Sequence, residues 1–201
     1  MSGGIAILGW GSLVWDLEAL APRVSGGWAM RAGPRLPMEF SRISVKRRMG
    51  LVVCLDPEAG VPCPTNVIAS RRTGLEATVA DLALRERAPH DRIGWARASG
   101  DGESRLPAVA DAVAAWCVAA GWTAAVWTDL EPNFRETTGR RYGVPEAIDY
   151  LRGLRGPSLA EAHRYIRNAP CGTRTPLRRA LTRDPWWRAV TRRTRGGVYS
   201  P

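Results

Sequence analysis

Short apolar runs separated by turn residues recur along the first two thirds of the chain. Residues 5–8, 38–45, 50–55, 66–70 and 122–128 are rich in β-branched and large apolar side chains and are bounded by Gly, Pro or Asp, which predicts strands. Residues 93–96 form a shorter candidate strand. The segment 24–37 contains Gly26-Gly27 and Gly33-Pro34, which indicates a loop.

The clearest helical pattern follows residue 73. Leu75, Val79 and Leu82 are spaced by four and three residues and form one apolar stripe, and Thr73 with Glu76 resembles a capping box. Glu86 lies four residues after Leu82 and therefore projects from the same face. A surface helix normally keeps a carboxylate off its buried stripe, so Glu86 is a candidate functional residue.

Three further segments have helical signals. Pro107 suits the first turn of a helix that ends before Gly121, residues 144–154 are helical in pattern, and Ser158 with Glu161 suggests a second capping box for a helix to residue 168. Strands and helices do not alternate strictly, so a doubly wound parallel sheet fits poorly. We expect an α+β fold, with a small mixed β-sheet or barrel flanked by helices.

Charge and cysteine usage restrict the candidate functions. The formal net charge is +10, carried almost entirely by arginine and scattered along the chain except near the C-terminus. The sequence contains neither a zinc finger nor an aromatic–basic RNA motif, which argues against a nucleic-acid partner.

The four cysteines are far apart, so we expect buried thiols, no metal and no cofactor. No apolar run could span a membrane and no signal peptide is evident, so we expect a cytoplasmic protein. The sequence gives no indication of its oligomeric state.

The loop Gly9-Trp10-Gly11-Ser12-Leu13 follows the first strand and allows several interpretations. A dinucleotide fingerprint requires a third glycine where Val14 stands, and a Ser12 nucleophile requires a nearby base that no sequence feature supplies. The glycines would also expose main-chain N–H groups able to hold a carboxylate or an oxyanion. An ordinary strand-to-helix turn is the remaining interpretation.

This loop and the helix ending at Glu86 together resemble the γ-glutamyl cyclotransferase-like family. Residues 6–15, Ala-Ile-Leu-Gly-Trp-Gly-Ser-Leu-Val-Trp, are similar to the opening signature of that family, especially in its glutathione-degrading branch. Residues 81–87, Asp-Leu-Ala-Leu-Arg-Glu-Arg, are similar to the segment that carries the family's catalytic glutamate. The likeness covers about residues 4–130, and Trp10 replaces the tyrosine usual in the family.

The resemblance implies a domain organisation and a mechanism. Residues 1–130 would form the cyclotransferase-like domain. Beyond the likeness, the sequence pattern predicts that residues 131–185 form a helical extension packed on the same domain and that residues 186–201 form a basic tail. Glu86 would be the acid/base residue, and the main chain of Trp10, Gly11, Ser12 and Leu13 would hold the substrate. The reaction would release 5-oxoproline from a small γ-glutamyl amide or peptide by attack of its own α-amine.

Three alternatives stay open at the level of sequence. The same fold could perform another amide cleavage or a biosynthetic deprotection step. The chain could be a non-enzymatic basic module that binds nucleic acid. Glu86 itself could be an ordinary helix-end residue paired with Arg85 or Arg87.

Overall fold

The computed structural model describes residues 3–196, with side chains to residue 192, and shows an α+β protein of two compact units. The first unit combines Met1–Leu36 with Pro62–Leu130, and the second combines Pro37–Val61 with Glu131–Pro201. The sequence had suggested one domain over residues 1–130. The structure groups residues 37–61 from that range with the C-terminal segment.

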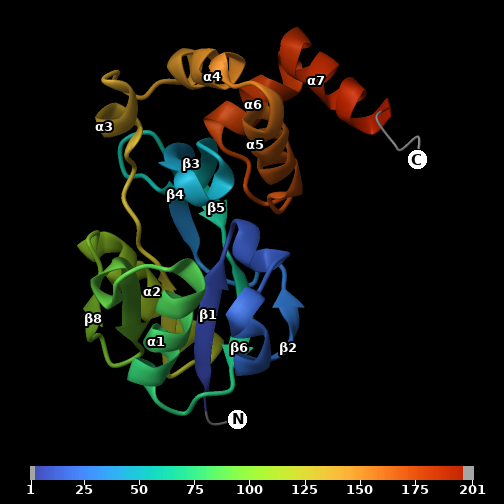
Figure 1. Ribbon diagram of the computed structural model, residues 1–201. Helices are drawn as coiled ribbons and strands as arrows, with labels where there is room; N and C mark the ends of the chain where they lie inside the picture. Colours follow the sequence, from blue (N-terminus) through green and yellow to red (C-terminus); the bar gives the residue numbers. More distant parts are fainter. Residues whose placement is uncertain (1–2, 197–201) are drawn as a thin grey trace. The chain divides into compact units, whose positions relative to one another are not determined.

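A mixed six-stranded sheet forms the first unit (Figure 1). Its central strand, β1, pairs antiparallel with β6 and parallel with β9, and β9 pairs antiparallel with β7. The strand order is β2 (Val24–Ala29), β6 (Asn66–Ser70), β1 (Ile5–Gly9), β9 (Ala124–Thr128), β7 (Ile93–Arg97) and β8 (Gly102–Glu103).

Two helices pack on this sheet and bury the apolar stripes that the sequence indicated. Helix α1 (Leu75–Glu86) places Leu82 in a core that includes Ile7 and Val126, with Leu75 and Val79 packed against it. Helix α2 (Pro107–Ala120) begins with proline and ends at Gly121 in the left-handed conformation, as predicted. Short 3-10 turns connect the strands and helices: η1 (Ser12–Val14), η2 (Glu18–Arg23) and η4 (His90–Arg92).

Most of the second unit is helical. It also contains β4 (Gly50–Leu55) and most of β3 (Arg35–Ser44), which the 3-10 turn η3 (Val45–Arg47) joins. The three-stranded sheet has the order β4, β3 and β5 (Val61–Pro64). The helices are α3 (Phe134–Thr138), α4 (Val144–Gly153), α5 (Gly156–Asn168), α6 (Pro176–Arg183) and α7 (Pro185–Gly196). The expected basic tail, residues 186–201, thus lies in α7 as far as Gly196; residues 197–201 are outside the described range.

Several local predictions were wrong. Residues 24–29, taken as a loop, form the edge strand β2, and Gly26 with φ of 72° lies where the pairing with β6 shifts register. The predicted capping boxes are absent, since α1 begins after Gly74 and α5 after Arg155, with no side-chain cap at either. Pro157 in the first turn of α5 favours the earlier start.

The cysteines follow the prediction in part. Cys54, Cys63 and Cys117 are buried, whereas Cys171 is exposed, and none of the four forms a disulfide bond. Across residues 3–196, no helix is both long and apolar enough to cross a membrane.

Candidate active site

The candidate site lies in the first unit, at the end of the six-stranded sheet where strands β1 and β9 terminate. Because β1 and β9 run parallel, with Ile5 opposite Ala124 and Ile7 opposite Val126, their carboxyl ends meet at the same edge. The Gly9–Leu13 loop leaves β1 there, and Asp129 follows β9. In open sheets with parallel strands this edge is where ligands commonly bind.

The loop is anchored at Gly9 by close packing and a buried hydrogen bond. A Cβ atom at Gly9 would lie 2.6 Å from Cη2 of Trp28, so only glycine fits against this indole without displacing it. The Gly9 carbonyl accepts a hydrogen bond from Asn66 Nδ2 at 2.9 Å, and Asn66 Oδ1 accepts one from the Arg31 N–H at 3.0 Å. Asn66 therefore fixes the strand end from which the loop departs.

Past Gly9 the loop tightens into the 3-10 turn η1. The Val14 N–H donates to the Gly11 carbonyl, and the Asp16 N–H donates to the Ser12 carbonyl at 2.9 Å. The N–H groups of Gly11, Ser12 and Leu13 donate to no group in the described part of the chain. Main-chain N–H groups without an acceptor are the kind that hold anions, although residues 11–13 are buried in this structure.

Side chains in the loop contribute to the core. Trp10 and Leu13 are about 95% buried, and Ser12 is nearly so. Of the four residues predicted to hold substrate, Trp10 and Ser12 carry polar side-chain groups, an indole N–H and a hydroxyl, and both side chains are buried. The main chain is consequently the chemically useful part of this loop.

Glu86 is the last residue of α1, and its side chain is 17% exposed. Its Oε1 accepts a hydrogen bond from Arg85 Nη1 at 2.9 Å, so the predicted alternative of an ion pair with Arg85 is present. Its Oε2 accepts no hydrogen bond from any residue between 3 and 196. Arg85 thus binds Oε1 of the carboxylate, and Oε2 has no hydrogen-bond donor among the described residues.

Arg85 connects Glu86 to the loop segment. Its side chain is 1% exposed, and its Nη2 donates to the main-chain carbonyl of Asp16 at 2.5 Å. One buried guanidinium therefore contacts both the Glu86 carboxylate and the residue that closes the turn begun at Ser12. A charged hydrogen bond of this kind is stronger than a neutral one and restrains both partners.

The sequence reasoning did not identify Arg85 or Asn66 as site residues. In the sequence Arg85 is one of many arginines, and only its burial distinguishes it. Asn66 stands at the first position of an apolar strand, a position where a polar side chain would have been a usable signal.

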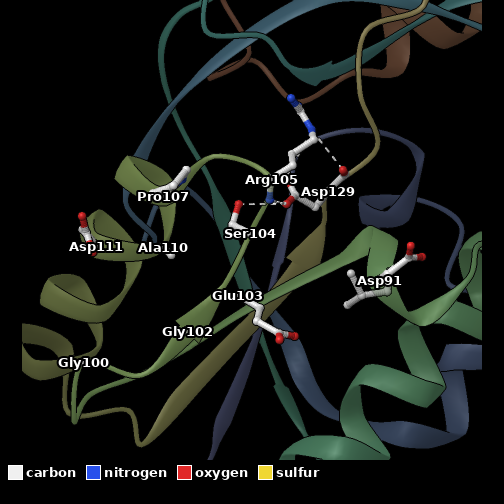
Figure 2. A pocket seen from close by; sticks show the side chains of 11 residues that line it. Asp91, Gly100, Gly102, Glu103, Ser104, Arg105, Pro107, Ala110, Asp111 and Asp129 are labelled. Atoms are coloured by element: carbon white, nitrogen blue, oxygen red, sulfur yellow. Dashed lines mark hydrogen bonds and ion pairs between the residues drawn. The ribbon is translucent and has the colours of Figure 1, made fainter.

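A cavity of about 430 Å³ borders the same sheet edge through Asp91 and Asp129 (Figure 2). Figure 2 shows Ser104 and Arg105 converging on Asp129, whose Oδ2 accepts hydrogen bonds from the Ser104 hydroxyl at 2.8 Å and the Arg105 N–H at 2.7 Å. Asp129 thereby joins the end of β9 to the start of α2. The other carboxylates lining the cavity, Asp91, Glu103 and Asp111, are exposed.

A second buried polar cluster lies in the second unit and contains no predicted site residue. Glu39 is fully buried, and its oxygens accept hydrogen bonds from the Phe40 N–H at 2.7 Å and the Leu177 N–H at 3.1 Å. Burial raises the pKa of Glu39, opposed by these bonds and by one from the Thr175 side chain. Burial likewise raises the pKa of Tyr142, with the nearby Glu39 charge adding to the effect.

The described residues contain no group of three His, Cys, Asp or Glu side chains placed to hold a metal ion.

Comparisons with protein-family models, with curated proteins and with solved structures found no match to this chain.

Proposed function

We propose that the chain is a γ-glutamyl cyclotransferase-like enzyme that releases 5-oxoproline from a small γ-glutamyl amide or peptide. The observation that carries this proposal is the shared guanidinium of Arg85, which contacts both the Glu86 carboxylate and the Asp16 carbonyl of the loop segment. The candidate acid/base group and the candidate main-chain donors come from sequence positions about seventy residues apart. Arg85 links Glu86 to Asp16, three residues after the last of these donors, which supports a site that uses both.

The reaction needs little from the protein beyond positioning and proton transfer. The substrate's α-amine attacks its own γ-carbonyl, so a C–N bond forms within a five-membered ring while the original amide C–N bond breaks. The substrate must be held bent, and an intramolecular attack of this type gains greatly from fixed geometry. No Ser, Cys or His nucleophile is needed.

Glu86 would take one proton from the attacking ammonium and deliver one to the leaving amine. Its open Oε2 is available for both transfers, while Arg85 keeps Oε1 in a fixed orientation. The N–H groups of Gly11, Ser12 and Leu13 would hold the substrate α-carboxylate or the oxyanion that forms at the γ-carbon. Under this proposal the first unit has the cyclotransferase-like fold.

The test compares Glu86→Gln with the unaltered chain on a panel of γ-glutamyl amines and peptides. Chromatography would score 5-oxoproline against free glutamate. Loss of the proton acceptor should lower the rate on the order of 10²–10⁴-fold. Glu76→Gln, a change at an exposed position in the first turn of the same helix, is the matched control and should retain full activity.

Two outcomes would contradict the proposal. Full activity in Glu86→Gln would remove this residue from the chemistry. Release of free glutamate in place of 5-oxoproline would favour the alternative, in which the fold catalyses a hydrolytic amide cleavage.

A further inference from the structure

The net positive charge of the protein comes from the second unit. This unit carries 19 of the 29 lysines and arginines but only 9 of the 19 aspartates and glutamates, a difference of +10. The first unit carries the remaining 10 of each and is formally neutral. A compositional preference for arginine would act on both units alike, so it does not account for this segregation.

Many of the excess arginines in the second unit are exposed and lack acidic partners. The two acidic residues of helices α5 to α7 are already engaged: Glu161 pairs with Arg47 and Arg164, and Asp184 pairs with Arg152. Six exposed arginines make no ion pair with any described residue, and we call them the α5–α7 arginines: Arg167, Arg174, Arg179, Arg183, Arg188 and Arg192.

Four of the six arginines form pairs with i, i+4 spacing on helices α6 and α7. Arg179 and Arg183 are one turn apart on α6, opposite the buried Leu177 and Leu181. Arg188 and Arg192 have the same spacing on α7. Four helical residues span about 6 Å, whereas each strand of a nucleic-acid duplex presents one phosphate per about 3.4 Å of helix axis. Each pair can therefore reach closely spaced phosphates of one strand.

The backbone that carries these pairs is held in place by polar contacts. Arg178 donates to the carbonyls of Pro170 at 2.6 Å and Ala169 at 2.6 Å, which ties the end of α5 to α6. Asp184 Oδ1 accepts the Trp187 N–H at 3.0 Å and fixes the turn between α6 and α7. The arginines are thus presented from a rigid scaffold, which lowers the entropy lost on binding.

We propose that the α5–α7 arginines bind the phosphate backbone of a duplex nucleic acid without reading its sequence. Guanidinium groups match phosphate oxygens in a bidentate geometry, and closely spaced phosphates meet the i, i+4 pairs. The arginines are scattered along the sequence, but their excess over acidic residues lies almost entirely in residues 131–201, which belong to the second unit. The proposal is independent of the cyclotransferase activity, whose residues lie in the first unit.

The experiment measures binding of a fluorescent 20-base-pair DNA duplex by anisotropy, with an RNA duplex in parallel, between 50 and 200 mM salt. Kd for the unaltered chain is expected at about 10⁻⁴–10⁻⁶ M near physiological salt. The variant R179Q/R183Q/R188Q/R192Q should bind more weakly at every salt concentration. The slope of log K against log salt should become shallower by about 0.9 for each lost phosphate contact.

The matched control removes four exposed arginines from the first unit, in R31Q/R35Q/R71Q/R97Q. It changes the net charge equally and should keep the salt slope of the unaltered chain. Circular dichroism and 5-oxoproline release should show that the second-unit variant stays folded and active.

Three results would overturn the proposal. They are the absence of binding to either duplex at 50 mM salt, an equal loss of binding in the control variant, and a salt slope that the second-unit variant leaves unchanged.

Discussion

Replacing Arg85 by methionine tests the central contact of the candidate site through stability alone. The substitution keeps an unbranched apolar side chain in a position that is 1% exposed but removes the charge that faces Glu86 at 2.9 Å. The Glu86 carboxylate, 17% exposed, would be left largely out of water without its partner. Removing one member of a buried pair costs about 3–5 kcal/mol.

Two details of the structure refine that estimate. The partial exposure of Glu86 lets water compensate for some of the lost pairing, which favours the lower end of the range. The hydrogen bond from Arg85 to the Asp16 carbonyl is also lost, adding about 1 kcal/mol. We expect Arg85→Met to lower the free energy of unfolding by about 3–4 kcal/mol.

Urea unfolding monitored by circular dichroism would measure the effect, together with Glu86→Gln and the double variant. Because the two side chains are in contact, the double variant should be more stable than the sum of the single effects predicts, by about 2 kcal/mol. Arg87→Met, at the exposed neighbouring arginine, should stay within about 0.5 kcal/mol. The reasoning is refuted if Arg85→Met is as mild as Arg87→Met, or if the cycle shows no coupling.

Three further predictions concern other parts of the chain. Gly9→Ala should lower the free energy of unfolding by about 1–3 kcal/mol, measured by urea titration, because its Cβ would lie 2.6 Å from the Trp28 ring. Since burial raises the pKa of Glu39 above 4.5, its contribution to stability is fully present below that pH and is lost as pH rises through the folded-state pKa. The free energy of unfolding should accordingly depend less on pH in Glu39→Gln than in the unaltered chain. Ellman's reagent at pH 8 should modify one thiol rapidly, that of exposed Cys171, while burial, which raises the pKa of Cys117 to about 11, keeps that thiol slow.

Each of these predictions has a control or a contradicting result. Gly27→Ala adds a Cβ with no neighbour within 4 Å and should be nearly neutral. If the free energy of unfolding changed with pH by the same amount in Glu39→Gln and in the unaltered chain, Glu39 would not set the pH dependence. A rapid thiol that persists in Cys171→Ser would show that another cysteine is accessible.

Local patterns in the sequence predicted much of the fold. The strands at residues 50–55 and 66–70 and the helix from Pro107 to Ala120 are found where expected. Each is defined by signals inside the segment: an apolar run, a proline in the first turn or a glycine stop. The buried stripe of α1 was predicted for the same reason.

Features that depend on distant partners were missed. Strand β2 forms by antiparallel pairing with β6, with a register shift between Ser25 and Ala29. Nothing within residues 24–29 indicates that pairing. The burial of Arg85 depends on Asp16, which lies 69 positions earlier. The gathering of positive charge was in contrast visible in the sequence, since residues 131–201 carry 15 arginines and 6 acidic residues, and residues 37–61 add only +1.

The parallel pairing of β1 with β9 also has a consequence for how the protein is made. Ile5 emerges from the ribosome about 120 residues before its partner Ala124, which corresponds to about 6–24 s at ordinary rates of synthesis. During that interval one edge of β1 has no native neighbour, and closing so long a loop is entropically slow. The nascent chain therefore offers an apolar strand edge that a chaperone could cover until translation is nearly complete.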